Sequence, residues 1–196
     1  MATINDEDEV IYSEEKVPKY ELPDPLMGGN GKKLTDPDEW GTRRRQILDL
    51  FEEHMYGKPP TTTVKLDFEV RSTDRNALGG LSTRKEVCIT AGEGSQALRM
   101  DLLLYLPNGQ KTPAPVFLGL NFFGNHTIHP DPAISLTKSW VFAAPGATGP
   151  DANRANPATR GVSASRWPVE RILKRGYALA TMYYGDIDPD FDDGFQ

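Results

Sequence analysis

The pattern of hydrophobic and polar positions divides the chain into stretches that predict different elements. Residues 1–33 are polar, rich in Pro and Gly and without a period, so we expect an extended N-terminal arm. A helix is predicted next, because apolar residues then recur near helical spacing, behind Asp36 as N-cap and ahead of Gly57. The apolar positions that define this helix are Trp40, Ile47, Phe51 and Met55.

The middle of the chain alternates apolar and polar residues, which is typical of half-buried strands. We predict strands over residues 64–70, 83–90 and 98–106. Hairpin-length loops join them, so neighbouring strands should pair antiparallel. The single cysteine, Cys88, lies in the second strand, where a buried and inert thiol is expected rather than a nucleophile.

Two continuous apolar runs, at 115–123 and 177–184, predict strands buried on both faces. Between them lie a long irregular loop over 127–164 and a helix that we expect to open at Ser165 or Arg166. A strand, a crossover with a helix and a second strand make a parallel βαβ unit. The predicted fold class is therefore α/β, with an antiparallel meander leading into a parallel sheet. This is the entry pattern of an α/β-hydrolase-like domain, a three-layer sandwich of which residues 34–196 form an incomplete amino-terminal portion.

The formal net charge of −6 argues against nucleic acid and anionic membranes as partners, since both favour a basic face. There is no run of 18 apolar residues, and the acidic start of the chain does not resemble a signal peptide. An acidic polysaccharide stays compatible with this charge, because a local cluster of Arg can override it.

The candidate chemistry lies in the polar loop after the first apolar run, because sites in α/β sheets collect at the carboxyl ends of strands. Two interpretations stay open for this loop. Its backbone amides could bind a developing oxyanion, or it could be a polar turn that closes the strand. The residues concerned are Phe122, Phe123, Gly124, Asn125 and His126.

Three further motifs favour structure over chemistry. His126, His129 and Asp131 are close in sequence, but no further ligand is evident, so we predict no metal site. The acidic run at 186–193 is interpreted as a surface turn, since Phe191 stands where a calcium loop needs Gly. Ser163 follows Gly161 as in a nucleophile elbow, but no strand precedes it. We therefore predict no catalytic residue within the chain.

Several long motifs, in one order from about Val17 onward, resemble those of bacterial glucuronoyl esterases. They are Tyr20-Glu21-Leu22-Pro23-Asp24-Pro25-Leu26, Phe51-Glu52-Glu53-His54-Met55-Tyr56-Gly57, the stretch 116–127, Arg166-Trp167-Pro168-Val169-Glu170-Arg171, and Tyr183-Tyr184-Gly185-Asp186-Ile187-Asp188-Pro189-Asp190. The resemblance implies an α/β-hydrolase fold and cleavage of the ester between 4-O-methyl-glucuronic acid on xylan and lignin alcohols. It implies acyl transfer by a serine, a histidine and an acid, with no metal or organic cofactor.

The family's nucleophile elbow is absent from this sequence, so the resemblance implies the amino-terminal part of such an enzyme, inactive by itself. It implies that Arg154 and Arg160 contact the substrate, a glucuronoxylan polysaccharide. It also implies a secreted or periplasmic protein that is a monomer when complete. Two alternatives stay open: an acetylxylan esterase-like hydrolase, and a non-catalytic carbohydrate-binding remnant.

Overall fold

The computed structural model describes residues 11–59, 61–143 and 151–191. The chain divides into two compact units, Met1–Thr62 and Thr63–Gln196. The division into an arm over 1–33 and a domain over 34–196 stays a prediction. Neither helix among the described residues has the length and apolar character that crossing a bilayer requires.

The described residues of the first unit contain one α-helix, α1, over Trp40–His54, directly preceded by a 3₁₀ turn at Pro37–Glu39. The side chain of Asp36 accepts a hydrogen bond from the backbone N–H of Asp38 at 3.0 Å, which confirms Asp36 as the N-cap. Upstream, Met27 and Lys33 form an isolated antiparallel bridge.

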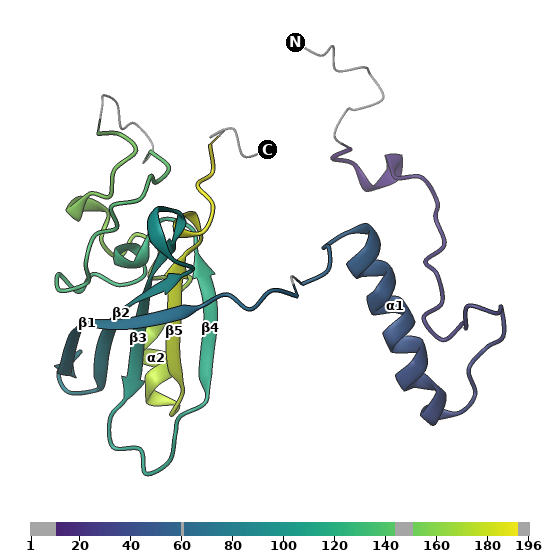
Figure 1. Ribbon diagram of the computed structural model, residues 1–196, viewed down its shortest axis with the longest axis horizontal. Coiled ribbons are helices and arrows are strands. Elements are labelled where there is room, and N and C mark those ends of the chain that lie inside the picture. The colour runs from purple at the N-terminus through teal and green to yellow at the C-terminus, as the bar shows by residue number, and fades with distance from the viewer. Residues whose placement is uncertain (1–10, 60, 144–150, 192–196) are drawn as a thin grey trace. The chain divides into compact units, whose positions relative to one another are not determined.

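The second unit is built on one five-stranded sheet with the order β1-β2-β3-β5-β4 (Figure 1). The first three strands and the β3–β5 pair are antiparallel, whereas β4 and β5 are parallel. This confirms the predicted fold class. The bounds are β1 Leu66–Ala77, β2 Ser82–Ala91, β3 Leu98–Pro107, β4 Val116–Asn121, α2 Val169–Lys174 and β5 Ala178–Tyr183.

Helix α2 begins at Val169, three or four residues later than predicted. The preceding segment forms successive turns instead, with Ala164 N bonded to the carbonyl of Gly161 and Arg166 N to that of Ser163, both at 2.9 Å. Pro168 explains the shift, because a proline disfavours the helical conformation of the residue before it. The N-cap of α2 is therefore Pro168.

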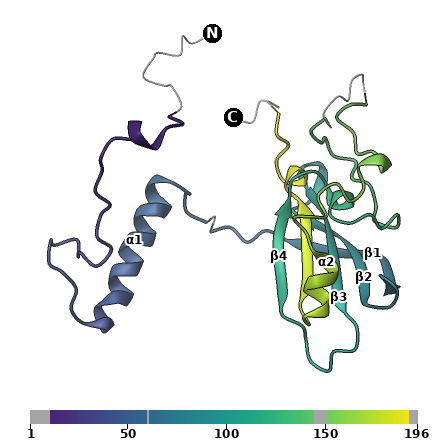
Figure 2. The ribbon, with the colours of Figure 1, turned by 180° about the vertical axis from the view of Figure 1, so that it is seen from behind.

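One face of the sheet is covered by α2 and by the long loop between β4 and α2 (Figure 2). Helix α2 contacts β3 and β5, the two strands beneath it. The core lies between these layers and contains Ala77, Leu103, Tyr105, Ile128, Ile134, Val169, Leu173 and Leu179. Cys88 is buried, as predicted.

Strand β4 lies at the edge of the sheet, and one of its faces is exposed. The expectation that both of its faces are buried is therefore wrong. Leu118 is 68% exposed, and Val116 and Leu120 are exposed with it. The cause is position: β4 pairs only with β5, and no helix among the described residues of this unit covers the face on which Leu118 lies. The sheet is therefore layered on one side only.

Candidate functional site

The polar loop after β4 is fixed by the buried side chain of Asn121, the last residue of the strand. Its Nδ2 donates to Asn125 Oδ1 at 2.6 Å and to Thr181 Oγ1 at 3.1 Å, and its Oδ1 accepts from Gly124 N at 2.9 Å. Asn125 Nδ2 then donates to the carbonyl of Asp101 at 2.7 Å. Because these buried groups satisfy one another, they hold the loop against β3, β4 and β5 without leaving their amides unpaired.

Gly124 is required at the centre of this loop. Its φ of 97° lies in the left-handed region, and a Cβ there would lie 3.1 Å from Nδ1 and Cε1 of His126. Since the Gly124 amide already donates to Asn121, the polar-turn interpretation accounts for this N–H. An oxyanion-binding role for Phe122, Phe123, Gly124, Asn125 and His126 stays a prediction.

His126 is buried as a neutral imidazole. Its Nε2 lies 2.9 Å from Thr159 Oγ1, and that hydroxyl donates its own proton to the carbonyl of Asn156 at 2.7 Å. The proton on this side of the ring is therefore on Nε2, and Nδ1 has no hydrogen-bond partner among the described residues. Burial, and then the charge of Arg160, lower the pKa of His126 to about 4.

His129 is fixed in a similar way. The backbone N–H of Asp131 donates to His129 Nδ1 at 3.0 Å, so Nε2 carries the proton and donates to Glu170 Oε1 at 3.0 Å. This hydrogen bond lowers the pKa of Glu170. Neither ring is bonded to a serine in the described part of the chain, nor do three or more His, Cys, Asp or Glu gather there as a metal site would need.

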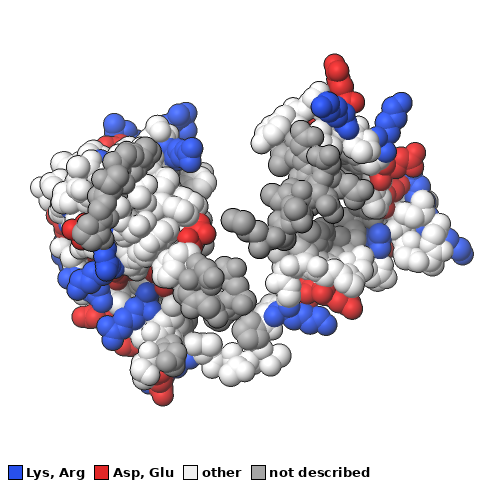
Figure 3. Space-filling view, turned by 90° about the horizontal axis from the view of Figure 1, so that it is seen from above, with Lys and Arg blue, Asp and Glu red and all other residues white. Residues whose placement is uncertain are grey.

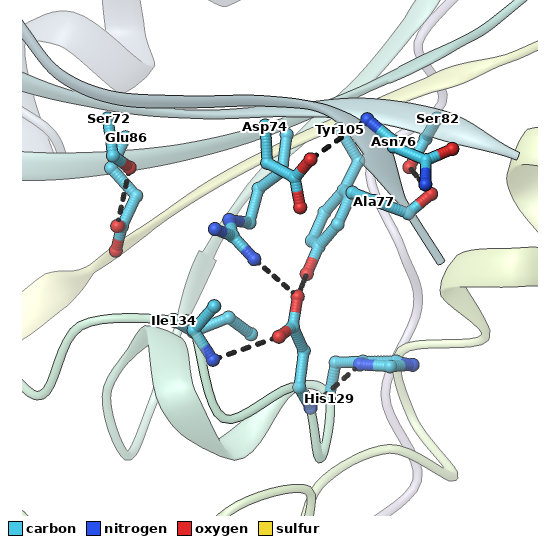
Figure 4. Close-up of polar contacts among 12 residues, drawn as sticks. Ser72, Asp74, Asn76, Ala77, Ser82, Glu86, Tyr105, His129 and Ile134 are labelled. Atoms are coloured by element: carbon cyan, nitrogen blue, oxygen red, sulfur yellow. Dashed lines mark hydrogen bonds and ion pairs between the residues drawn. The ribbon is translucent and has the colours of Figure 1, made fainter. Parts of the chain in front are cut away.

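A buried ion pair anchors the same loop to the sheet (Figure 4). Asp131 Oδ2 receives hydrogen bonds from Arg84 Nη1 on β2 and, at 3.3 Å, from the hydroxyl of Tyr105 on β3. Burial alone would raise the pKa of Asp131, but the hydrogen bonds from Ala133 N, Arg84 and Tyr105 outweigh it and lower the pKa. Asp131 therefore stays ionised beneath the sheet.

A cavity of about 560 Å³ opens beside the His126 loop. The segment after Gly161 closes one side, because Gly161 N donates to the carbonyl of His126 at 3.1 Å and Ser163 N to that of Thr127 at 2.9 Å. The lining combines apolar walls with hydroxyl, amide and charged groups. Its residues are Phe123, His126, Thr127, Val141, Phe142, Ala143, Asp151, Ala152, Arg154, Asn156, Thr159, Val162, Ser163, Ser165 and Arg166.

The two arginines predicted to contact substrate are placed differently. Arg154 lines the cavity. Arg160 does not, and its Nη1 donates to the carbonyls of Asp131 at 3.2 Å and Ile134 at 2.6 Å, so it supports the loop. Arg166 is the second arginine that lines the cavity. On the face shown in Figure 3, Lys and Arg are interspersed with Asp and Glu and form no continuous basic surface.

Aromatic rings cluster at the carboxyl ends of β4 and β5. Phe122 stacks on Phe142 with ring centroids 5.4 Å apart and on Tyr184 at 5.0 Å. Trp140 packs edge-on against Phe142 at 4.9 Å, and its carbonyl accepts from the Tyr183 hydroxyl at 2.9 Å. Phe122 remains half exposed, so the cluster offers an aromatic surface next to the cavity that Phe123 and Phe142 line.

The sequence patterns gave no sign of several residues that build this region. Asp186 was assigned to a surface turn, yet its Oδ1 accepts from Ser139 Oγ at 2.7 Å and its Oδ2 from Asp101 N at 3.0 Å, which ties the loop to β3. Arg84 lies in the predicted strand over 83–90, and the available signal was alternation, which places it on the same face as the buried Cys88. In the structure Arg84 pairs with Tyr105 on this inward face of the sheet.

No family model matches the chain. Among curated proteins, the carbohydrate esterase MZ0003 from an unknown prokaryotic organism is 50% identical over 182 residues, which are 92% of this chain and 42% of that protein. A solved structure of a promiscuous CE15 esterase from a marine bacterial metagenome is also 50% identical, with a TM-score of 0.81 over 92% of this chain and 45% of that one.

A glucuronoyl esterase from Solibacter usitatus is 46% identical, with a TM-score of 0.77 over 91% of this chain and 44% of that chain. A CE15 glucuronoyl esterase from Teredinibacter turnerae, at 20% identity and a TM-score of 0.58, shares the fold. The chain thus spans less than half the length of the relatives it matches. It is homologous to the CE15 carbohydrate esterases over one part of their length, as the resemblance to glucuronoyl esterases indicated.

Proposed function

We propose that this chain forms part of a glucuronoyl esterase, which hydrolyses carboxylic esters of glucuronate on xylan. The observation that carries the proposal is the 50% identity over 182 residues to a carbohydrate esterase, with a matching fold. In the proposed reaction a serine attacks the ester carbonyl, a histidine takes the serine proton and passes it to the leaving alcohol, and water then releases the acid.

We assign the described residues to substrate binding and to support rather than to bond breaking. His126 and His129 have ring protons committed to Thr159 and Glu170, and neither is bonded to a serine. We therefore expect the reacting serine, histidine and acid to come from the part of the relatives that this chain does not match. The cavity and the aromatic cluster at its edge suit a sugar chain, which presents hydroxyl groups and apolar faces together.

A chimeric esterase tests this function. The 182 matched residues of the 50% identical carbohydrate esterase would be replaced by those of this chain, and hydrolysis of benzyl glucuronate and of acetylated xylan would be measured. We expect kcat/KM on benzyl glucuronate to stay within about tenfold of the parent enzyme, because the exchanged part supplies binding and scaffold groups rather than the nucleophile.

A control is needed for folding, so the melting temperature of the chimera is measured alongside its activity. A chimera that melts cooperatively but has lost hydrolysis of benzyl glucuronate overturns the proposal. Preferential release of acetate from xylan would favour the acetylxylan esterase alternative instead.

We further propose that the protein acts in the periplasm or outside the cell. The support is physical: a xylan polymer is too large to cross a membrane, so an enzyme that cleaves its side-chain esters must reach it outside the cytoplasm. Fractionation of the producing cells, with detection of this chain by antibody, tests the location. Recovery in the cytoplasmic fraction alone would contradict it.

A further inference from the structure

Arg154 and Arg166 line one cavity, and among the described residues of that lining they are the only arginine or lysine side chains. His126 adds no charge to this wall near neutral pH, because its pKa is lowered to about 4 by burial and by Arg160. Asp151 is the one acidic residue that the structure describes on this lining, and it is exposed. The charged groups of the cavity therefore favour an anion.

Both guanidinium groups have donors to offer a ligand. Arg154 uses Nη1 for the carbonyl of Lys138 at 3.0 Å, which fixes the side chain and leaves its other N–H groups. Arg166 is exposed and is positioned by its backbone N–H on the carbonyl of Ser163 at 2.9 Å. In the part of the chain that the structure describes, its guanidinium has no ion pair.

The rest of the lining indicates what kind of anion fits. Val141 and Phe142 form apolar wall, which weakens solvent screening of a charge held against the arginines. Asn156 and Ser163 supply the amide and hydroxyl groups that pair with sugar hydroxyls. A guanidinium fork matches a carboxylate in two hydrogen bonds. Arginine, hydroxyl and aromatic groups together match a sugar acid better than a neutral sugar or an inorganic anion.

We propose that this cavity binds the free carboxylate of a uronate sugar through Arg154 and Arg166. The ester that the proposed function would cleave is uncharged at its carboxyl group, so this site recognises an acid group other than the intact ester. The identity of the sugar rests on the proposed function, whereas the preference for a carboxylate rests on the cavity alone. The carboxylate is that of an unesterified glucuronate branch of the polymer, and hydrolysis of the ester leaves such a branch on the xylan when the alcohol departs.

The test compares ligands that differ only in charge. The chain is immobilised at low density on a sensor surface, and binding is measured for xylotetraose carrying one 4-O-methyl-glucuronic acid branch and for the methyl ester of the same oligosaccharide. We expect the free acid to bind about tenfold more tightly, with the difference shrinking at high salt. Arg154→Ala and Arg166→Ala should each reduce the preference at least ~3-fold, and the double variant should abolish it.

Arg171→Ala is the matched control, because Arg171 is an exposed arginine on α2 outside the lining. It should leave the preference unchanged. Glucuronate alone is the third ligand: equal binding of the monosaccharide shows that the sugar acid by itself fills the cavity, and binding of the oligosaccharide alone shows that the xylan backbone contributes as well.

Equal binding of the acid and its methyl ester overturns the proposal, as does a preference that survives the double variant. These outcomes are separate from the proposed function. A chimera that hydrolyses benzyl glucuronate while this chain shows no preference for the acid would refute the carboxylate site and leave the esterase standing.

Discussion

His126 is a buried residue that contacts more than one segment of the loop region. Its ring lies against Gly124, and its Nε2 donates to the hydroxyl of Thr159. Its backbone carbonyl accepts a hydrogen bond from Gly161 N. A protonated imidazole would add a buried charge next to Arg160, which is why the pKa of His126 lies well below its usual value. The folded state therefore favours the neutral form of His126.

This burial predicts a pH dependence of stability. The folded-state pKa of His126 is about 4 and the unfolded value is near 6.5, so the unfolded chain binds the proton first as the pH falls. The contribution of His126 is complete above pH 6.5 and is lost progressively down to pH 4, by about 3 kcal/mol in all. Urea unfolding at a series of pH values measures this loss.

His126→Gln should flatten the dependence between pH 6.5 and 4, since Gln keeps an N–H for Thr159 but does not titrate. His54→Gln is the control, because His54 is exposed on α1. An unchanged slope in His126→Gln would show that other groups carry the dependence. Loss of the ionised Asp131 contributes at still lower pH, because the pKa of Asp131 is itself lowered.

At the scale of elements, the sequence predicted what local periodicity determines. All five strands of the described residues were found, because alternation and apolar runs mark extended segments. The same patterns did not report burial, since the apolar residues of β1 and β4 are exposed. The contacts of the long loop could not be found in this way. Arg84 and Asp131 are 47 positions apart, and no local pattern relates two residues whose side chains meet only after the sheet has formed.

We expect removal of the Arg84–Asp131 ion pair to lower the stability of the fold strongly, because the pair joins β2 to the loop that follows β4. Arg84→Met leaves the Asp131 carboxylate nearly buried with only Tyr105 and Ala133 as donors, so we expect a loss of about 3 kcal/mol in the free energy of unfolding. Denaturant titration measures it.

Two further variants make this result specific. Arg84→Met combined with Asp131→Asn should recover part of the loss, because the unpaired charge is removed. Arg99→Met, an exposed arginine on the neighbouring strand β3, should change stability by less than about 0.5 kcal/mol. If Arg84→Met were no worse than Arg99→Met, the pair would not anchor the loop.

For the whole molecule, the most consequential feature is the sheet face opposite α2. The strand register places the apolar side chains of β1 and β4 on this same face, and they are exposed in the second unit: Leu66, Phe68, Val70, Val116, Leu118 and Leu120. Strand β4 also ends the strand order, and within 11–59, 61–143 and 151–191 no strand pairs with its outer side. An apolar edge strand of this kind is a template for pairing with another chain.

We therefore expect this chain by itself to self-associate through β4, with an apparent size in gel filtration that rises with concentration. Leu118→Lys places a charge on the edge and should shift the chain toward the monomer, because a buried lysine would oppose strand pairing. Leu22→Lys is the matched control, since Leu22 is also an exposed leucine but lies in the first unit. If wild type elutes as a single monomer at every concentration, the open edge does not drive association. If both lysine variants act equally, general apolar exposure rather than β4 is the cause.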